Sequence, residues 1–520
     1  MARVRGLFEH DHSCLGLNMD ILNAFLHHLS VGAAEALTWT NLWYCFVGVF
    51  LGTLVGVLPG LGSLVTISLL LPVTYHLPPT SALIMLAGVY FGADYGGGTT
   101  SILLGVPGHP ASAVDVLDGY PMTKQGRGGV ALFMKCIASF WGSSVGIVLL
   151  MMFAPLLATA AMSFGPPEYF ALMLLGLVAA STIGEGSPVT GLAMMTLGLL
   201  LSLMGTDVNS GVERFTFGML DLSEGLGLIV VAMGVFAVTE VIRSAGSPSI
   251  HAVKQKFGMR EQMPTREDWR RSWGAMLRGS GIGSFFGTLP GTGGGMATFL
   301  AYAVEKRMAK QPERFGKGAI EGIAAPEACN NAGVGTAFIP TLTLGIPGDA
   351  IMALLLAGLV VQGIQPGPMV MSTNPELFWG LIVSFWVGNL MLLVLNIPLI
   401  GIWVRLLSIP YHLLFPGILL FTCIGVYSTH YNTFELYALL VFGVFGYVAW
   451  LLRLEVVPMI LGLILGQPIE ENFRRSMLIF DGDLTVFTQR PISATAIAVT
   501  AALLLWSFKS YLGRMRTKNK

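Results

Sequence analysis

Two short polar segments interrupt strongly apolar stretches of this chain, and their residue types suit the binding of an ion or an anionic solute. They are Asp94-Tyr-Gly-Gly-Gly-Thr-Thr-Ser101 and Glu327-Ala-Cys-Asn-Asn-Ala-Gly-Val-Gly-Thr336. Polar groups at membrane depth are costly and usually line a site or a pathway. Exposed backbone N–H groups and helix N-termini attract anions, whereas carbonyl, Asn and Thr oxygens suit a small cation such as sodium. The alternative for each residue is helix packing or capping.

Five ionisable residues lie nearest to these segments in the sequence: Asp94, His109, Glu321, Glu327 and Asp349. An acid in such a place could bind a cation, carry a proton or lie in a water-filled vestibule. The sequence favours none of the five individually as a proton carrier.

The polar segments accompany a duplicated pattern of Pro-Gly breaks. Gly56-Val-Leu-Pro-Gly60 returns as Gly287-Thr-Leu-Pro-Gly291, and Leu104-Gly-Val-Pro-Gly108 returns as Leu344-Gly-Ile-Pro-Gly348, in the same order. In a membrane protein, duplicated breaks indicate discontinuous helices around a central solute site. We expect hairpin tips at Pro59, Gly60, Pro290 and Gly291, and helix starts at Pro107, Gly108, Pro347 and Gly348.

The composition predicts an all-α polytopic membrane protein. Hydrophobic residues make up 54% of the chain and charged residues 11%, against about 25% charged in soluble domains. Leu381–Ile402, Phe434–Leu452 and Ala494–Trp506 approach or reach the length of a membrane span. We expect about 10–12 membrane segments, some of them broken. The formal net charge of zero gives no basic surface for nucleic acid.

The basic residues indicate how the segments are oriented, because lysine and arginine mark cytoplasmic loops. One basic stretch spans Arg243–Arg278 between the two halves, and a second includes Lys306, Arg307, Lys310, Arg314 and Lys317. If both are cytoplasmic, the stretch Gly279–Glu305 must leave and return on one side. It is too short to cross twice, so we predict a re-entrant hairpin.

The charge pattern is reversed between the two copies. No lysine or arginine follows the first hairpin at Tyr75–Thr80, but Lys124, Arg127 and Lys135 follow the first break region. The matching stretch Gln362–Asn374 has none. This reversal predicts two inverted repeats related by an axis in the membrane plane. The alternative is an ordinary tandem duplication whose loop charges differ by chance.

These patterns divide the chain into five parts. Residues 1–40 form an N-terminal extension and an amphipathic or first membrane segment, in which translation could start at Met1 or at Met19. The first repeat half covers 41–243, a cytoplasmic linker 244–278, the second half 279–492, and a C-terminal membrane helix with a basic tail 493–520.

The motifs of soluble enzymes give no support to catalysis. The five scattered cysteines show no disulfide or zinc spacing. Gly142-Ser-Ser-Val-Gly146 matches the esterase pattern G-x-S-x-G, but that motif requires a strand-turn-helix context. Here it is expected in an apolar helix as a packing face. The chain has no Walker loop, which argues against ATP hydrolysis. No nucleophile–base pair is placed at membrane depth, so an intramembrane hydrolase is the least favoured alternative and we predict that the chain is not an enzyme.

The whole chain from about Met19 resembles a known family, the large membrane subunit of the tripartite tricarboxylate transporters (TctA family). The most specific segments are Gly56–Gly60, Tyr95–Gly108, Asp118–Tyr120, Gly165–Ala171, Arg214–Gly218 and Pro326–Gly348. The resemblance implies a secondary carrier in the bacterial inner membrane. It also implies two partners: a small four-helix membrane subunit and a soluble periplasmic binding protein that delivers a carboxylate. Uptake in the family is usually driven by an ion gradient, most often sodium.

The resemblance assigns substrate and ion binding to the polar segments. The residues concerned are Tyr95, Gly96, Gly97, Gly98, Thr99, Thr100, Ser101, Asn330, Asn331, Gly335 and Thr336. Sodium is the candidate ion, at Asn330/Asn331 and Thr99/Thr100, and no other cofactor is expected. The chain departs from the family around Val106-Pro-Gly108, where Gly105 and His109 replace the usual polar and acidic neighbours. This departure puts citrate specifically in doubt.

The function that follows is ion-gradient-driven uptake of di- or tricarboxylates as the large permease subunit of a three-part system. Two alternatives stay open at this point: a stand-alone organic-anion carrier and a passive anion channel. A channel predicts flux that does not depend on an ion gradient.

Overall fold

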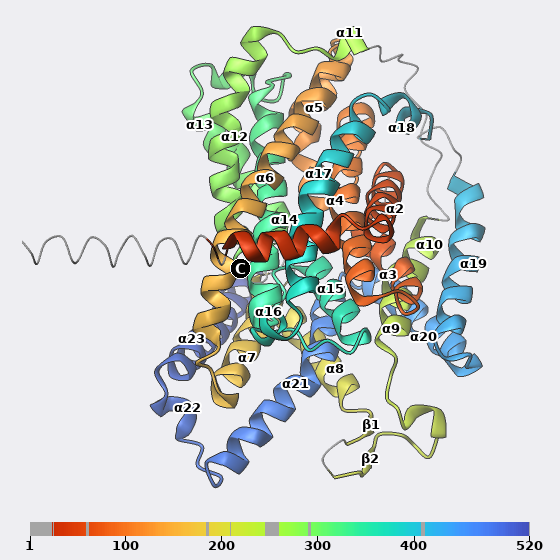
Figure 1. Cartoon of the computed structure of the whole chain (residues 1–520), viewed down its shortest axis with the longest axis vertical. Helices are drawn as coiled ribbons and strands as arrows, with labels where there is room; N and C mark the ends of the chain where they lie inside the picture. The colour runs from red at the N-terminus through yellow and green to blue at the C-terminus, as the bar shows by residue number, and fades with distance from the viewer. Residues whose placement is uncertain are drawn as a thin grey trace, which may run out of the picture.

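The computed structural model describes residues 23, 25–58, 62–183, 187–207, 210–244, 259–289, 293–406 and 411–518. Nearly all of this part of the chain is helical (Figure 1). Five of its helices are long and apolar enough to cross a membrane: α2 (Trp39–Gly56), α6 (Gly128–Ala161), α17 (Pro375–Asn396), α20 (Thr433–Leu451) and residues Pro491–Lys509 of α23 (Pro491–Lys518). The prediction of an all-α polytopic membrane protein is confirmed.

The first half contains one long central helix, α4, flanked by shorter elements. After α2 come α3 (Gly62–Thr74), α4 (Pro79–Leu104), the 3-10 helix η1 (Pro110–Val114), α5 (Asp115–Lys124), α6, α7 (Pro166–Ile183), α8 (Pro188–Ser202), β1 (Gly205–Thr206), β2 (Glu213–Arg214), η2 (Leu220–Leu222), α9 (Leu228–Ala232), the π-helical turn η3 (Met233–Val238) and α10 (Thr239–Ser244). The two strands pair antiparallel, with Gly205 opposite Arg214.

The second half repeats the hairpin and the long central helix. Its elements are α11 (Met259–Gln262), α12 (Arg266–Gly287), α13 (Gly293–Met308), η4 (Pro312–Arg314), α14 (Glu321–Leu344), α15 (Ala350–Val361), α16 (Met369–Thr373), α17, α18 (Ile400–Leu406), α19 (Tyr411–His430), α20, α21 (Val457–Ile479), α22 (Val486–Gln489) and α23.

The long helices α4 and α14 end in the same way. Gly105 and Gly345 cap them, and both have φ 70° and ψ 21°. This left-handed conformation favours glycine, because a Cβ would clash with the backbone. The Pro-Gly pairs then lead directly to the next helices, whose N-caps are His109 for η1 and Asp349 for α15. The predicted helix starts at Pro107, Gly108, Pro347 and Gly348 therefore lie at real helix interruptions.

Each long helix is also packed against the first hairpin helix of its own half through three glycines spaced by four. Gly48, Gly52 and Gly56 place α2 on α4, and Gly279, Gly283 and Gly287 place α12 on α14. A Cβ at any of the six would overlap a backbone carbonyl of the facing helix. Such small-residue stripes let helix backbones approach closely in a membrane. The two halves share this unit; their inverted relation stays a prediction.

One part of the sequence interpretation is wrong. The segments Tyr95–Ser101 and Asn330–Thr336 are not unwound breaks, because both lie inside the continuous helices α4 and α14. Their backbone is therefore helical, although Pro340 of α14 has no N–H to donate to the Thr336 carbonyl. The interruptions occur after these segments, at Gly105 and Gly345.

Three basic segments meet at one end of the molecule. Arg127 between α5 and α6 pairs with Asp268 at the start of α12, with an N–O distance of 2.8 Å. Gln125 donates to the carbonyl of Lys317, which follows η4, over 2.8 Å. In Figure 1 α11 lies at this end and the β1–β2 hairpin at the opposite end. The expected grouping of the basic loops on one side is supported by these contacts.

Lys135 does not belong to that group. Its position in the sequence predicts a loop charge, but Lys135 lies inside α6 and is 0% exposed. The sequence reasoning placed it in a loop because it follows Lys124 and Arg127 closely. Lys124 and Arg127 alone remain as basic residues of this connection.

Several predicted features lie outside the described residues. These are the hairpin tips Pro59, Gly60, Pro290 and Gly291, most of the N-terminal extension, and residues 245–258 of the linker. Residues 25–36 are helical and run across the central helices (Figure 1). They contact α17, where the ring of His28 stacks on that of Trp379 at 5.2 Å.

Candidate functional site

A buried polar cluster joins the two halves where α4 faces α14. The Asp94 carboxylate on α4 accepts a hydrogen bond from Asn330 Nδ2 on α14 at 3.1 Å and one from Ser63 Oγ on α3 at 3.4 Å. His109 Nε2, at the start of η1, lies 3.9 Å from the same carboxylate. Asp94 is 4% exposed. Carboxylate, amide and hydroxyl oxygens on three helices are a plausible donor set for a hard cation such as sodium.

A second contact between the halves lies one helical turn earlier on α4. Tyr90 donates its hydroxyl hydrogen to Asp349 Oδ2 over 2.6 Å. Asp349 Oδ1 accepts from the Met352 amide at 2.7 Å and so caps α15. Thus His109 and Asp349, the residues that follow the two Pro-Gly pairs, both face polar side chains of α4.

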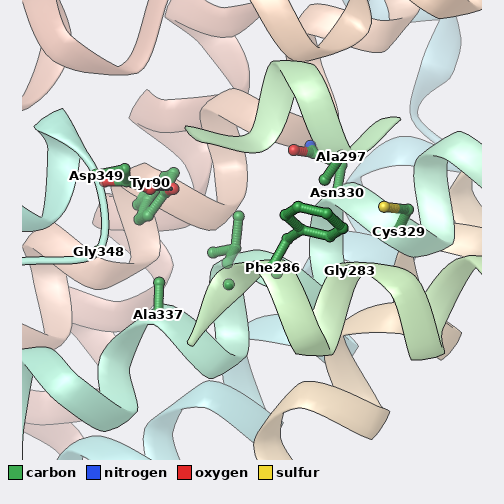
Figure 2. Close-up of a pocket in the computed structure, with 12 residues that line it drawn as sticks. Tyr90, Gly283, Phe286, Ala297, Cys329, Asn330, Ala337, Gly348 and Asp349 are labelled. Carbon is green, nitrogen blue, oxygen red and sulfur yellow. Dashed lines mark hydrogen bonds between the residues drawn. The ribbon is translucent and has the colours of Figure 1, made fainter. Parts of the chain in front are cut away.

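A small cavity lies between these groups, α12 and α14. Its volume is ≈ 20 Å³, which is room for a single water-sized group. Figure 2 shows Tyr90 and Asp349 together on one side of it and Phe286, Asn330 and Cys329 on the other. A di- or tricarboxylate does not fit in this volume.

The glycine run of α4 forms a surface on which polar groups from several elements converge. A Cβ at Gly97 would lie 2.8 Å from His109 Nε2. A Cβ at Gly98 would lie 3.2 Å from Lys135 Nζ and would overlap the Glu327 carboxylate. A Cβ at Gly96 would instead lie 2.6 Å from the backbone nitrogen of Val57, just after α2. A side chain is therefore excluded at Gly97 and Gly98 by polar side chains, and at Gly96 by the backbone of α2.

Glu327 and Lys135 flank Gly98 from α14 and α6. Glu327 Oε2 accepts from Ser139 Oγ at 2.7 Å and from Asn331 Nδ2 at 3.3 Å. Lys135 Nζ donates to the Tyr95 carbonyl oxygen. The sequence reasoning gave Lys135 no role in the site, although a lysine within the apolar run 128–161 was a usable signal.

Other predicted site residues make contacts that fit the packing alternative. Thr100 Oγ1 donates to the Val57 carbonyl at 2.7 Å, and Tyr95 donates its hydroxyl hydrogen to Asn389 Oδ1 at 2.9 Å. The remaining hydroxyls donate to carbonyls within their own helices: Thr99, Ser101 and Thr336. Gly335 packs against Gly146 of α6. Glu321 lies apart from the cluster and faces Arg271 and Arg314.

The serine of the esterase-like pattern lies inside α6. Ser144 donates to the Phe140 carbonyl at 2.7 Å, which is a helical i−4 contact. The strand-turn-helix that this motif requires is not formed by residues 142–146, which are helical.

Comparison with known proteins gives the family. The model of the tripartite tricarboxylate transporter TctA family matches residues 42–461. This chain belongs to the TctA family. It is therefore of a transporter family, and its long apolar helices agree with a multi-pass membrane protein. TctA proteins belong to tripartite transporters, which work with further membrane and binding subunits.

Two relatives of this TctA-family chain come from Agrobacterium vitis. One, named an uncharacterised 52.8 kDa protein in the TAR-I ttuC′ 3′ region, is 47% identical over 487 residues, covering 94% of this chain and 96% of the relative. The other, an uncharacterised protein in the TAR-II ttuC′ 3′ region, is 51% identical over 217 residues, covering 42% of this chain and 90% of the relative. No solved structure matches the chain.

Proposed function

We propose that this chain is the large permease subunit of a binding-protein-dependent carrier. The carrier takes up di- or tricarboxylates across the bacterial inner membrane. An ion gradient drives the uptake, and sodium is the candidate ion. The observation that carries the proposal is the contact of Asp94 with Asn330 and His109, which joins both halves at one buried point. Membership of the TctA family supports the substrate class and the partners. The carboxylate itself is expected to be selected largely by the binding protein.

A buried acid that bridges two halves of a carrier can couple an ion to a conformational change. A cation bound by Asp94 and Asn330 would neutralise the buried carboxylate between α4 and α14, and its release would leave that charge unneutralised and shift the balance between conformations. An anionic substrate approaching the same surface would be repelled by Asp94 unless the cation came with it. This gives a physical reason for co-transport.

The test is uptake of labelled mono-, di- and tricarboxylates into cells that express this chain with its small membrane subunit and its binding protein. Assays run with sodium, without sodium and without the binding protein. Accumulation that requires both sodium and the binding protein is the expected result. Accumulation without the binding protein would instead establish a stand-alone carrier, and gradient-independent equilibration would establish a channel.

The Asp94→Asn variant should lose ion coupling with little change in packing. The amide keeps the size of the side chain and can still contact Asn330 and Ser63, but it removes the negative charge. We expect sodium-stimulated uptake to fall at least about tenfold, since a hydrogen bond to a charged group contributes about 1.5–3 kcal/mol. Initial rates against sodium concentration measure this. Unchanged sodium dependence in the variant would remove Asp94 from the ion site.

A further inference from the structure

Lys135 is a buried cation that the described residues leave incompletely paired. It lies in the middle of α6 and is 0% exposed. A lysine ammonium carries three hydrogen-bond donors, and the described residues provide one acceptor, the Tyr95 carbonyl. None of the ion pairs within 4.0 Å among the described residues includes Lys135. Buried charges are normally paired, and an intramembrane lysine marks a functional site by default.

The space next to this ammonium is kept open by a glycine. A Cβ at Gly98 would contact Lys135 Cε at 2.6 Å and Nζ at 3.2 Å. The same position adjoins the Glu327 carboxylate of the other half. The ammonium therefore faces the α4–α14 boundary, where the two halves would separate to admit a solute.

Acidic groups surround this point. Asp94 on α4 and Asp115 at the start of α5 both lie within electrostatic range of Lys135. Asp115 lies within electrostatic range of Glu327, and its buried Oδ1 has no hydrogen-bond partner among the described residues. His109 lies at the same surface, within electrostatic range of Lys135. An anion can reach Lys135 only when these acids are neutralised by a cation or by protons.

We propose that the Lys135 ammonium is the counter-charge for a carboxylate group of the substrate, which it receives at the Gly97–Gly98 surface of α4. The two N–H donors that the Tyr95 carbonyl does not use match the two oxygens of a carboxylate. This inference rests on the proposed function, because it names the residue that recognises the anion. The competing explanation is that Lys135 only neutralises Glu327 within the fold.

A double-mutant comparison separates the two explanations. Lys135→Met, Glu327→Gln and the combined variant are assayed for uptake of butyrate, succinate and tricarballylate, alongside wild type. Lys124→Met is the control, because Lys124 is exposed at the end of α5, where its ammonium lies over the Tyr120 ring. Uptake is normalised to the amount of inserted protein, and each variant is checked for a monodisperse, thermally stable fold.

We expect succinate uptake by Lys135→Met to fall at least about tenfold, which is the lower end of what a charged hydrogen-bond partner contributes. Adding Glu327→Gln to this variant should not restore uptake. Lys124→Met should behave as wild type. If the combined variant recovers wild-type succinate uptake, Lys135 only neutralises Glu327 and the proposal is wrong. It is equally wrong if Lys135→Met transports normally.

Two further comparisons separate a folding defect, and a failure of the proposed function, from a failure of this inference. If Lys135→Met does not insert into the membrane, Lys135→Arg is measured instead, because arginine keeps the charge but changes its geometry. This variant should raise the KM for succinate at least about fivefold. An unchanged KM overturns the proposal. If the wild-type system takes up no carboxylate at all, the proposed function fails together with this inference. If wild type transports and the combined variant is rescued, this inference alone fails.

Discussion

The Gly98→Val variant should insert into the membrane but transport almost nothing. A branched side chain at this position would overlap the Glu327 carboxylate and the Lys135 side chain, which converge on Gly98 from α14 and α6. Overpacking of a tight interior typically costs about 1–3 kcal/mol, and here the displaced groups are charged and buried. We expect uptake to fall about 100-fold or more, measured as the initial rate per inserted protein.

A second glycine provides the control. Gly281 lies inside α12, is exposed, and a Cβ there would meet no atom within 4 Å. Gly281→Val carries the same intrinsic cost of a β-branched residue in a helix without a collision, so its uptake should stay close to wild type. Equal uptake by both variants would show that the space at Gly98 serves helix packing only.

Removal of the Asn331 side chain should also abolish uptake. Asn331 Nδ2 donates to Glu327 Oε2 at 3.3 Å and to the Glu327 carbonyl at 3.1 Å, and Ser143 Oγ donates to its Oδ1 at 3.4 Å. In Asn331→Ala the buried Glu327 carboxylate loses the Asn331 donor, which costs about 1.5–3 kcal/mol for a charged group. We expect a loss of uptake of at least about tenfold, with the protein still folded.

Asn396→Ala is the matched comparison, since Asn396 is also buried in a membrane helix and makes the same i−4 contact with a backbone carbonyl, but none with Glu327. It should retain uptake. Purified variants are compared by size-exclusion chromatography and thermal unfolding before transport is measured. Normal uptake by Asn331→Ala would remove this residue from the site.

Much of the architecture could be predicted from local features of the sequence. The low charge content and long apolar runs required membrane helices, because backbone groups in lipid must be satisfied internally. The Pro-Gly pairs required interruptions, and the structure has them after Gly105 and Gly345. The glycines spaced by four in α2 and α12 are also a local pattern, typical of close helix packing. The family resemblance depends on several specific segments in order, and the family comparison confirmed it.

The composition of the site could be predicted only in part. Gly97, Gly98, Asn330 and Asn331 lie where polar groups converge, but the threonines nearby donate to backbone carbonyls instead. A glycine- and threonine-rich segment looks like a break in the sequence, because these residues have lower helix propensity. Packing against α2 and α17 overrides that propensity and keeps α4 continuous.

The sequence by itself determined the membrane class, the duplicated unit and the family, because each depends on residue type and on spacing along the chain. Only the tertiary structure decided which charges meet. Asp94 contacts Asn330, Tyr90 contacts Asp349, and Lys135 and Glu327 share the space at Gly98. These partners come from different halves and are brought together by the packing of α6 against α14, with α4 beside them. No local pattern encodes that packing, so a lysine that looked like a loop charge lies at the centre of the protein.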